Sequence, residues 1–228
     1  MINVLIADDH SLVRQGLKRL LEEDADIHVV AEASDGLEAV KEYERVRPDV
    51  AVLDIGMPHK DGLETIKRLL SVDPDARILV LTMYPEEQFA VRTLKAGALG
   101  YITKGNSTAE LHRAVRTVRY GRRYLSDQGE NAVNLQLLAN RSEKTPVGTL
   151  SNRELQVLCL IARGYKSSKI SIELGLSTKT IETYRARLMQ KLCLQSDADI
   201  CRFAYDNKLV EGTAAPAVVA GKPPDPAD

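Results

Sequence analysis

The sequence predicts an α/β domain with a parallel sheet, followed by a smaller all-helical domain. Three observations point to this. Strand-like and helix-like patterns alternate from Met1 to about Tyr120, and the periodicity is purely helical from Leu150 onward. A polar stretch at 140–148, punctuated by Pro146, separates the two parts. A length of 228 residues is enough for two such domains.

The first part holds five strand-like runs, each followed by a helix-like run. The strand-like runs are Asn3–Ala7, His28–Ala33, Val50–Leu53, Arg77–Leu81 and Gly100–Thr103. The helical patterns lie at 11–23, 36–46, 62–72, 86–96 and 107–119. The third strand-like run is short, branched and apolar, which is typical of a strand buried on both faces. Five such units with right-handed crossovers predict a doubly wound, flavodoxin-like sheet with strand order 2-1-3-4-5.

Charged and polar side chains gather where these strands end. Asp8 and Asp9 follow the first strand, Asp54 the third, Thr82 ends the fourth and Lys104 follows the fifth. Three carboxylates in one crevice repel each other and favour a hard cation, for which Mg²⁺ with oxygen ligands is the natural choice. A hydroxyl and an ammonium beside them can hold phosphoryl oxygens. The set therefore predicts phosphoryl transfer at this edge of the sheet.

Each of these residues also has a plainer interpretation when taken alone. Asp54 could be a turn-forming residue after a strand, Asp8 a cap for the helix beginning near Ser11, and Tyr101 a core residue. We do not expect a zinc role for His10, because no second His or Cys lies at metal-ligand spacing around it.

Between the two parts, residues 121–147 lose the alternation and form a connector, within which Gln128–Ala139 could be a helix. The final stretch, 212–228, is rich in Ala and Pro and is expected to be disordered.

The second part, 148–211, predicts four helices. Ser151 and Glu154 form a capping box, and the helix that they open ends at Gly164. A short helix, Ser167–Leu174, stops at Gly175. A longer helix capped by Ser177 runs to Leu192, and Asp197 is expected to cap the last helix, 197–207. A short helix, a turn with glycine and a longer helix with a polar start predict helix-turn-helix geometry.

The longer helix is the candidate DNA-reading element. Its positions outside the core are Thr178, Lys179, Thr180, Glu182, Thr183, Arg185, Ala186 and Arg187. Cations there can neutralise phosphates, and threonines can meet base edges in the major groove. The alternative is a solvated helix face of alternating charge.

The two parts differ in charge, and the cysteines give no sign of a disulfide framework. Residues 1–120 carry 16 Lys and Arg against 20 Asp and Glu, whereas residues 148–211 carry 10 against 7, which permits nucleic-acid binding. The three cysteines lack metal spacing and favour a reducing cytoplasm. We expect no membrane span and no signal peptide.

The motifs of the first part resemble the receiver domain of two-component response regulators. They are DDH at 8–10, DIGMP at 54–58, LT at 81–82 and GYITK at 100–104, in order over the first 120 residues. The resemblance implies that Asp54 accepts a phosphoryl group from the histidine of a partner kinase, or from a small phosphodonor. One departure is Gly105, where many receivers carry proline.

The same resemblance implies a set of ligands. Mg²⁺ would be held by Asp9, Asp54 and the main-chain carbonyl of Gly56, with Asp8 acting through water. Thr82 and Lys104 would bind phosphoryl oxygens, and Tyr101 would rotate with Thr82 on activation.

The second part resembles the LuxR-type four-helix DNA-binding domain, through LSNRELQVL at 150–158 and KISIELGLSTKTIETYRARLMQKL at 169–192. The whole chain from 1 to 211 is thus similar to the NarL/FixJ family of response regulators. The resemblance implies that helix 197–207 pairs protomers on DNA. It also implies contacts to phosphates by Lys166 and Ser168, and a groove-facing set of Lys179, Glu182, Thr183 and Arg187.

These observations predict a cytoplasmic, non-enzymatic transcriptional regulator switched by phosphorylation. Its partners would be a histidine kinase, promoter DNA, a second copy of the chain and RNA polymerase. We expect a closed form in which the receiver covers the reading helix, and an open dimer. One alternative is a receiver whose DNA output is independent of phosphate. Another, a phosphatase of the haloacid dehalogenase type, would need an acid where Gly56 stands.

Overall fold

The computed structural model describes residues 1–57, 62–127, 129–131, 133 and 145–210, except for the side chain of Glu87. Within 127–133 the described residues are helical. The remainder of the helix expected over Gln128–Ala139 lies outside the described residues, and so does the tail 212–228 that was expected to be disordered.

Five parallel strands form a single sheet in the order β2-β1-β3-β4-β5, which confirms the predicted order 2-1-3-4-5. The predicted and observed strand bounds differ by one residue at most. The strands are β1 (Ile2–Ala7), β2 (Ile27–Ala33), β3 (Val50–Leu53), β4 (Ile78–Thr82) and β5 (Gly100–Thr103). All four residues of β3 are buried, as its branched apolar sequence requires for a strand at the centre of a covered sheet.

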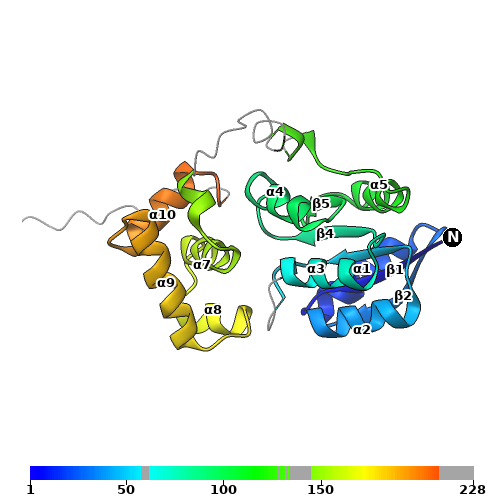
Figure 1. Cartoon of the computed structure of the whole chain (residues 1–228), viewed down its shortest axis with the longest axis horizontal. Helices are drawn as coiled ribbons and strands as arrows, with labels where there is room; N and C mark the ends of the chain where they lie inside the picture. The colour runs from blue at the N-terminus through cyan, green and yellow to red at the C-terminus, as the bar shows by residue number, and fades with distance from the viewer. Residues whose placement is uncertain (58–61, 128, 132, 134–144, 211–228) are drawn as a thin grey trace, which may run out of the picture.

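Helices cover both faces of this sheet (Figure 1). They are α1 (Ser11–Glu22), α2 (Gly36–Val46), α3 (Gly62–Val72), α4 (Glu86–Ala96) and α5 (Thr108–Arg119). One apolar cluster contains residues of α1 and α5, and a second contains residues of α2, α3 and α4. The alternating sides of the strands feed these two clusters, as a doubly wound sheet demands.

The start of α3 lies directly against the loop that follows β3. A Cβ added at Gly62 would come within 2.4 Å of the Cα of Ile55. Only glycine allows this approach, because any side chain would collide with the main chain. The close contact fixes the loop next to Asp54, so it positions the candidate site.

The second part is all-helical, as predicted. It consists of the 3-10 turn η1 (Pro146–Thr149) and the helices α7 (Asn152–Ala162), α8 (Ser167–Glu173), α9 (Thr178–Leu192) and α10 (Asp197–Asp206). The capping box of Ser151 and Glu154 is present, and Gly164 and Gly175 adopt positive φ after α7 and α8. Across the part of the chain that the structure describes, no helix is long and apolar enough to cross a membrane.

The cap predicted for the last helix is wrong by one residue. Ser196, not Asp197, is the N-cap of α10, with extended backbone angles and a hydroxyl that accepts from the amide of Asp199. The carboxylate of Asp199 in turn accepts a hydrogen bond from the amide of Ser196, which completes a capping box. Asp197 cannot make this box, because it is the first residue of the helix itself.

Candidate functional site

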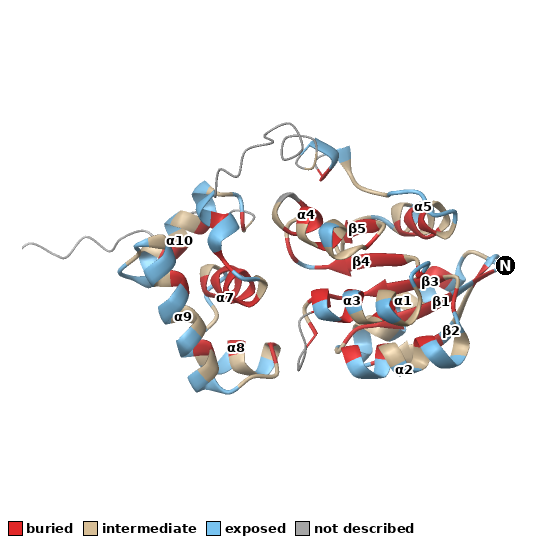
Figure 2. Ribbon diagram, viewed as in Figure 1, coloured by how far each residue is buried: buried red, intermediate tan, exposed pale blue. Residues whose placement is uncertain are grey.

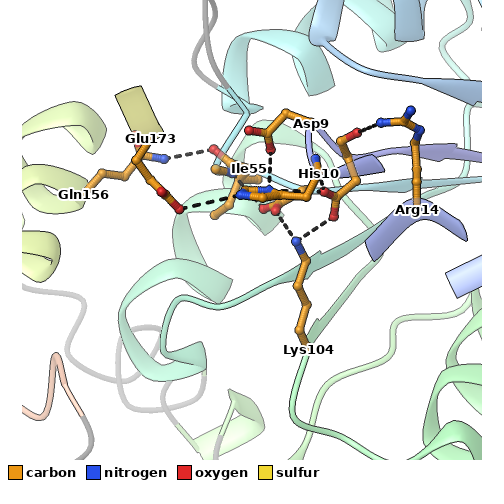
Figure 3. Close-up of polar contacts among 10 residues, drawn as sticks. Asp9, His10, Arg14, Ile55, Lys104, Gln156 and Glu173 are labelled. Carbon is orange, nitrogen blue, oxygen red and sulfur yellow. Dashed lines mark hydrogen bonds and ion pairs between the residues drawn. The ribbon is translucent and has the colours of Figure 1, made fainter. Parts of the chain in front are cut away.

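The predicted pocket residues meet at the carboxyl edge of the sheet, and Figure 3 shows Asp9 and Lys104 there. Asp8 follows β1, Asp54 follows β3, Thr82 is the last residue of β4, and Lys104 follows β5. Their convergence follows from the parallel topology, which brings the ends of these four strands to one edge. Asp8 and Thr82 are each 1% exposed and Asp54 is 5% exposed.

The ammonium of Lys104 lies between two buried carboxylates. Its Nζ forms an ion pair with Oδ2 of Asp8 at 2.6 Å and another with Oδ2 of Asp54. Burial by itself lowers the pKa of Lys104, but Asp54 and Asp8 outweigh this effect, so the pKa lies above its ordinary value. Lys104 is therefore a fixed cation that offsets the repulsion between the two carboxylates.

The second oxygen of each carboxylate is also held. The amide of Gly56 donates to Oδ1 of Asp54 at 2.7 Å, and the amide of His10 donates to Oδ1 of Asp8 at 2.8 Å. The alternative role of Asp8 as a helix cap is not what the structure has, because the N-cap of α1 is His10 and makes no side-chain cap bond. The pocket thus orients its carboxylates before any ligand arrives.

Thr82 and Tyr101 provide the polar groups beyond these carboxylates. Oγ1 of Thr82 is buried and has no hydrogen-bond partner among the described residues. An unpaired buried hydroxyl costs free energy unless a ligand oxygen completes it. Tyr101 is fully buried, and its hydroxyl donates to the carbonyl of Tyr84 at 2.9 Å. Tyr84 in turn stacks on Phe89 of α4, with the ring centroids 4.7 Å apart.

The donor set fits a hard divalent cation. One ligand atom each from Asp8, Asp9 and His10 lies within 4.8 Å of the others. Asp54 lies next to this group, because the ammonium of Lys104 forms ion pairs with both Asp54 and Asp8. Burial raises the pKa of Asp9, with Asp54 and Asp8 adding to the rise and His10 opposing it. A cation would offset that cost, and carboxylate oxygens are the ligands that Mg²⁺ prefers.

His10 takes part in this cluster more than the sequence indicated. Its Nδ1 lies 3.1 Å from Oδ1 of Asp9, and its Nε2 lies 3.9 Å from Oε1 of Glu173 on α8. Spacing along the chain could not reveal this, because Glu173 is distant in sequence and reaches the pocket from the helical domain (Figure 3).

The candidate DNA-reading face lies on α9 and the start of α8. Six of the predicted residues are exposed: Lys166, Ser168, Thr178, Lys179, Thr183 and Arg187. Glu182 is exposed as well, and its carboxylate accepts from the hydroxyl of Ser167 at 2.5 Å. The face is therefore polar and open to a partner in this structure.

Arg185 and Thr180, two further predicted reading residues, also make side-chain contacts within the protein. Nε and Nη2 of Arg185 donate to Oδ1 of Asp197 at 3.0 and 2.7 Å, which joins α9 to α10. The hydroxyl of Thr180 lies 2.8 Å from that of its N-cap residue, Ser177. Arg185 is thus a structural cation here, whereas Arg187, two residues on, is exposed.

The expected closed form, in which the receiver covers the reading helix, is not the arrangement in this structure. The groove-facing residues of α9 are exposed, and the first 120 residues meet the helical domain mainly through α7 (Figure 1). Arg92 of α4 adds bonds of 2.9 Å to the carbonyls of Val147 and Leu150 and to Oδ1 of Asn152. The nearly continuous apolar sequence of α7 was the one feature that indicated burial of this helix on more than one face.

Two family models match the chain. The first is the response regulator receiver domain, over residues 4–116. The second is the luxR family of bacterial regulatory proteins, over residues 148–204. Together the two models account for both halves of the observed fold.

Full-length relatives agree with these matches. Response regulator GacA of Pseudomonas viridiflava is 38% identical over 214 residues, which are 94% of this chain and 100% of that protein. Response regulator UvrY of Escherichia coli K12 is 38% identical over 209 residues, 92% of this chain and 96% of that protein.

Among solved structures, RcsB of Salmonella enterica serovar Typhimurium, bound to promoter P1flhDC in the presence of phosphomimetic BeF₃⁻, is similar with a TM-score of 0.60 and 26% identity. The match covers 90% of this chain and 98% of that one. The observed five-stranded parallel sheet and the helical second part agree with the two family models. The chain therefore belongs to the NarL/FixJ-type two-component response regulators, with a receiver domain followed by a LuxR-type DNA-binding domain.

Proposed function

We propose that this protein is a transcription factor whose binding to promoter DNA is controlled by phosphorylation of Asp54. Residues 1–120 would be the receiver, 121–147 the linker and 148–211 the DNA-binding domain. The observation that carries the proposal is the Lys104 ammonium held between the buried carboxylates of Asp8 and Asp54, beside the unpaired hydroxyl of Thr82.

The chemistry that these residues support is transfer of a phosphoryl group to a carboxylate. A carboxylate oxygen of Asp54 forms the new P–O bond while the P–N bond of a kinase phosphohistidine breaks, and the leaving imidazole nitrogen takes up a proton. Lys104 and Thr82 would hold the phosphoryl oxygens through a charge-assisted and a neutral hydrogen bond. Such a reaction needs positioning and charge neutralisation more than covalent assistance.

Asp8, Asp9, Asp54 and the carbonyl of Gly56 would hold Mg²⁺ in this pocket. The ion supplies neutralisation of the charge on the phosphoryl oxygens when it is bound. Asp54 would keep its orientation through the amide of Gly56, and Lys104 would move from pairing with Asp54 toward the incoming oxygens.

The helical domain would bind double-stranded promoter DNA through α9. The exposed Lys166 and Ser168 would contact phosphates, and Lys179, Thr183 and Arg187 would enter the major groove with Glu182. The α10 helix, whose Arg202 and Tyr205 are exposed, would pair two copies on adjacent half-sites. A histidine kinase and RNA polymerase complete the proposed partners, and the site of action is the cytoplasm.

We infer that the pocket is not an enzyme active site for small phosphate esters. Position 56, two residues after the nucleophile, is glycine and offers no general acid.

The experiment is labelling with acetyl phosphate and Mg²⁺, followed by intact mass and size in solution. Wild type should gain one phosphoryl group and shift toward a dimer, whereas Asp54→Asn should remain unlabelled. Labelling of Asp54→Asn to the wild-type level would contradict the assignment of the acceptor.

A further inference from the structure

Helix α7 is buried on every side, which is unusual for a helix at the edge of a small domain. All nine residues from Arg153 to Ile161 are buried (Figure 2). Its contacts with α8, α9 and α10 account for the side of the helix that faces its own domain. A helix packed against one partner leaves a polar stripe in water. The other side of α7 must therefore be covered by the receiver.

Three polar side chains of this segment donate to main-chain carbonyls of the receiver. Nε2 of Gln156 lies 2.9 Å from the carbonyl oxygen of Ile55, and Nη2 of Arg153 lies 3.5 Å from that of Met57. Nη2 of Arg163, the C-cap of α7, lies 2.8 Å from the carbonyl oxygen of Met83.

These carbonyls belong to the two loops that build the phosphoryl pocket. Ile55 and Met57 enclose Gly56 directly after Asp54, and Met83 directly follows Thr82. The bonds therefore hold the loops after β3 and β4 in a single arrangement. This α7 clamp, made by Gln156, Arg153 and Arg163, reaches the pocket from the DNA-binding domain.

The surroundings of Gln156 and Arg163 indicate how strongly these two residues bind the receiver loops. Gln156 is 1% exposed, so water cannot replace its bond to Ile55 while α7 is docked. The guanidinium of Arg163 also lies 5.9 Å from the ring centroid of Tyr84. The main-chain carbonyl of Tyr84 accepts a hydrogen bond from the hydroxyl of Tyr101. Arg163 therefore contacts the same loop that Tyr101 contacts.

We propose that the α7 clamp restrains the phosphoryl pocket, so that the DNA-binding domain controls how readily Asp54 is loaded. The inference rests on the proposed function of Asp54. Loading places three phosphoryl oxygens against Thr82 and Lys104 and recruits the carbonyl of Gly56, so both clamped loops must adjust. If loading weakens docking of α7, undocking strengthens loading by the same factor, because coupling between two equilibria is reciprocal.

The clamp differs from simple occlusion of DNA. Lys179, Thr183 and Arg187 remain exposed while α7 is docked, so docking does not bury the reading face. Its direct target is the receiver. Gln156, Arg153 and Arg163 are accordingly positioning residues, which act on the pocket through main-chain carbonyls.

The test is calorimetric titration of the full chain with BeF₃⁻ at saturating Mg²⁺, with BeF₃⁻ standing in for the phosphoryl group. The variants are Gln156→Ala and Arg163→Ala. Each should bind BeF₃⁻ about fivefold more tightly than wild type, the factor expected for one lost net hydrogen bond of docking. Gln190→Ala, at an exposed position of the same domain, is the matched control and should bind as wild type does.

The direction of the change in affinity distinguishes loss of the clamp from structural damage, because a damaged receiver would bind BeF₃⁻ more weakly than wild type. Arg163 is exposed, so its substitution leaves the core intact if Gln156→Ala proves unstable. Affinities equal to or weaker than that of wild type in both clamp variants would overturn the inference. Absence of binding in wild type and in all variants would instead remove the proposed function, and the clamp with it.

Discussion

Compared with the exposed face of α9, the pocket around Asp54 keeps its charged side chains buried and paired. Lys104 pairs with both Asp8 and Asp54 inside the receiver, while Lys179 and Arg187 on α9 are open to solvent. The receiver is built to accept one small, highly charged group. Under the proposed function, the reading face would meet an extended polyanion.

The difference shows how burial separates the two tasks. In a buried pocket each charge has a large effect on stability, because removing one charged side chain leaves its partner buried without a compensating charge. An exposed face spreads the same kind of interaction over several weak, salt-sensitive contacts. Substitutions should therefore have large, local effects in the pocket and small, additive effects on α9.

The largest expected effect is on acceptor chemistry. Asp54→Asn should reduce labelling by acetyl phosphate to below about 1% of the wild-type rate, because an amide cannot replace the carboxylate nucleophile. Intact-mass measurement over time gives the rate. Asp75→Asn, on an exposed turn of the same domain, is the matched control and should label normally. Equal loss in both variants would point to general damage.

Removing the cation of the pocket should cost stability. Lys104→Met leaves Asp8 and Asp54 buried together, and should lower the free energy of unfolding by about 3 kcal/mol in EDTA. Mg²⁺ should restore part of this loss, because it can occupy the same carboxylates. Urea denaturation with and without Mg²⁺ measures both. A variant as stable as wild type in EDTA would refute the view that Lys104 holds the pocket together.

On the reading face, neighbouring arginines should differ. Arg187→Ala should reduce the slope of log K against log salt for duplex DNA by up to about 0.9, because a guanidinium in the major groove lies near the phosphates and displaces about one counterion. Arg185→Ala should leave the slope nearly unchanged, because Asp197 already holds that guanidinium. Fluorescence anisotropy titrations at several salt concentrations provide the slopes. The reverse order of effects would mean that Arg185 leaves Asp197 on binding.

The smallest expected effect concerns pH. Burial raises the pKa of Glu154, but bonds from Lys191 and Ser151 outweigh it and hold the pKa below its usual value of 4.5. A depressed carboxyl pKa contributes stability above the unfolded-state value and loses it as pH falls through the folded-state value.

Glu154→Gln should therefore be less stable than wild type at pH 6 by about 1 kcal/mol, and the difference should shrink below pH 4.5. Urea unfolding across pH measures it. The exposed Glu44→Gln is the control and should show no such pH-dependent gap. A gap that grows as pH falls would have the wrong sign for this account.

The sequence was sufficient to predict the sheet order and the residues of the pocket. Alternating periodicity determines a parallel sheet, and a parallel sheet brings strand-end residues such as Asp8, Asp54 and Lys104 together. The helix α9 could be located for a similar reason, because the capping residue Ser177 and the glycine before it define where the helix begins.

What could not be predicted are contacts between residues distant in the chain. The apolar content of α7 indicates burial but does not say which surface covers it, so Gln156 was not identified. The pairing of Arg185 with Asp197 likewise depends on how α10 crosses α9. The way in which the two domains dock in this structure could not be predicted either, because resemblance gives the two domains but not their contact surface.

The most direct test of the central account is DNA affinity as a function of receiver loading. We would titrate the full chain onto duplex promoter DNA at fixed salt, with Mg²⁺ alone and with Mg²⁺ plus BeF₃⁻, beside Asp54→Asn. The account predicts that loading tightens binding by about tenfold or more in wild type and leaves Asp54→Asn unchanged. Equal affinity of loaded and unloaded wild type, with BeF₃⁻ binding verified by calorimetry, would contradict control of DNA binding by Asp54.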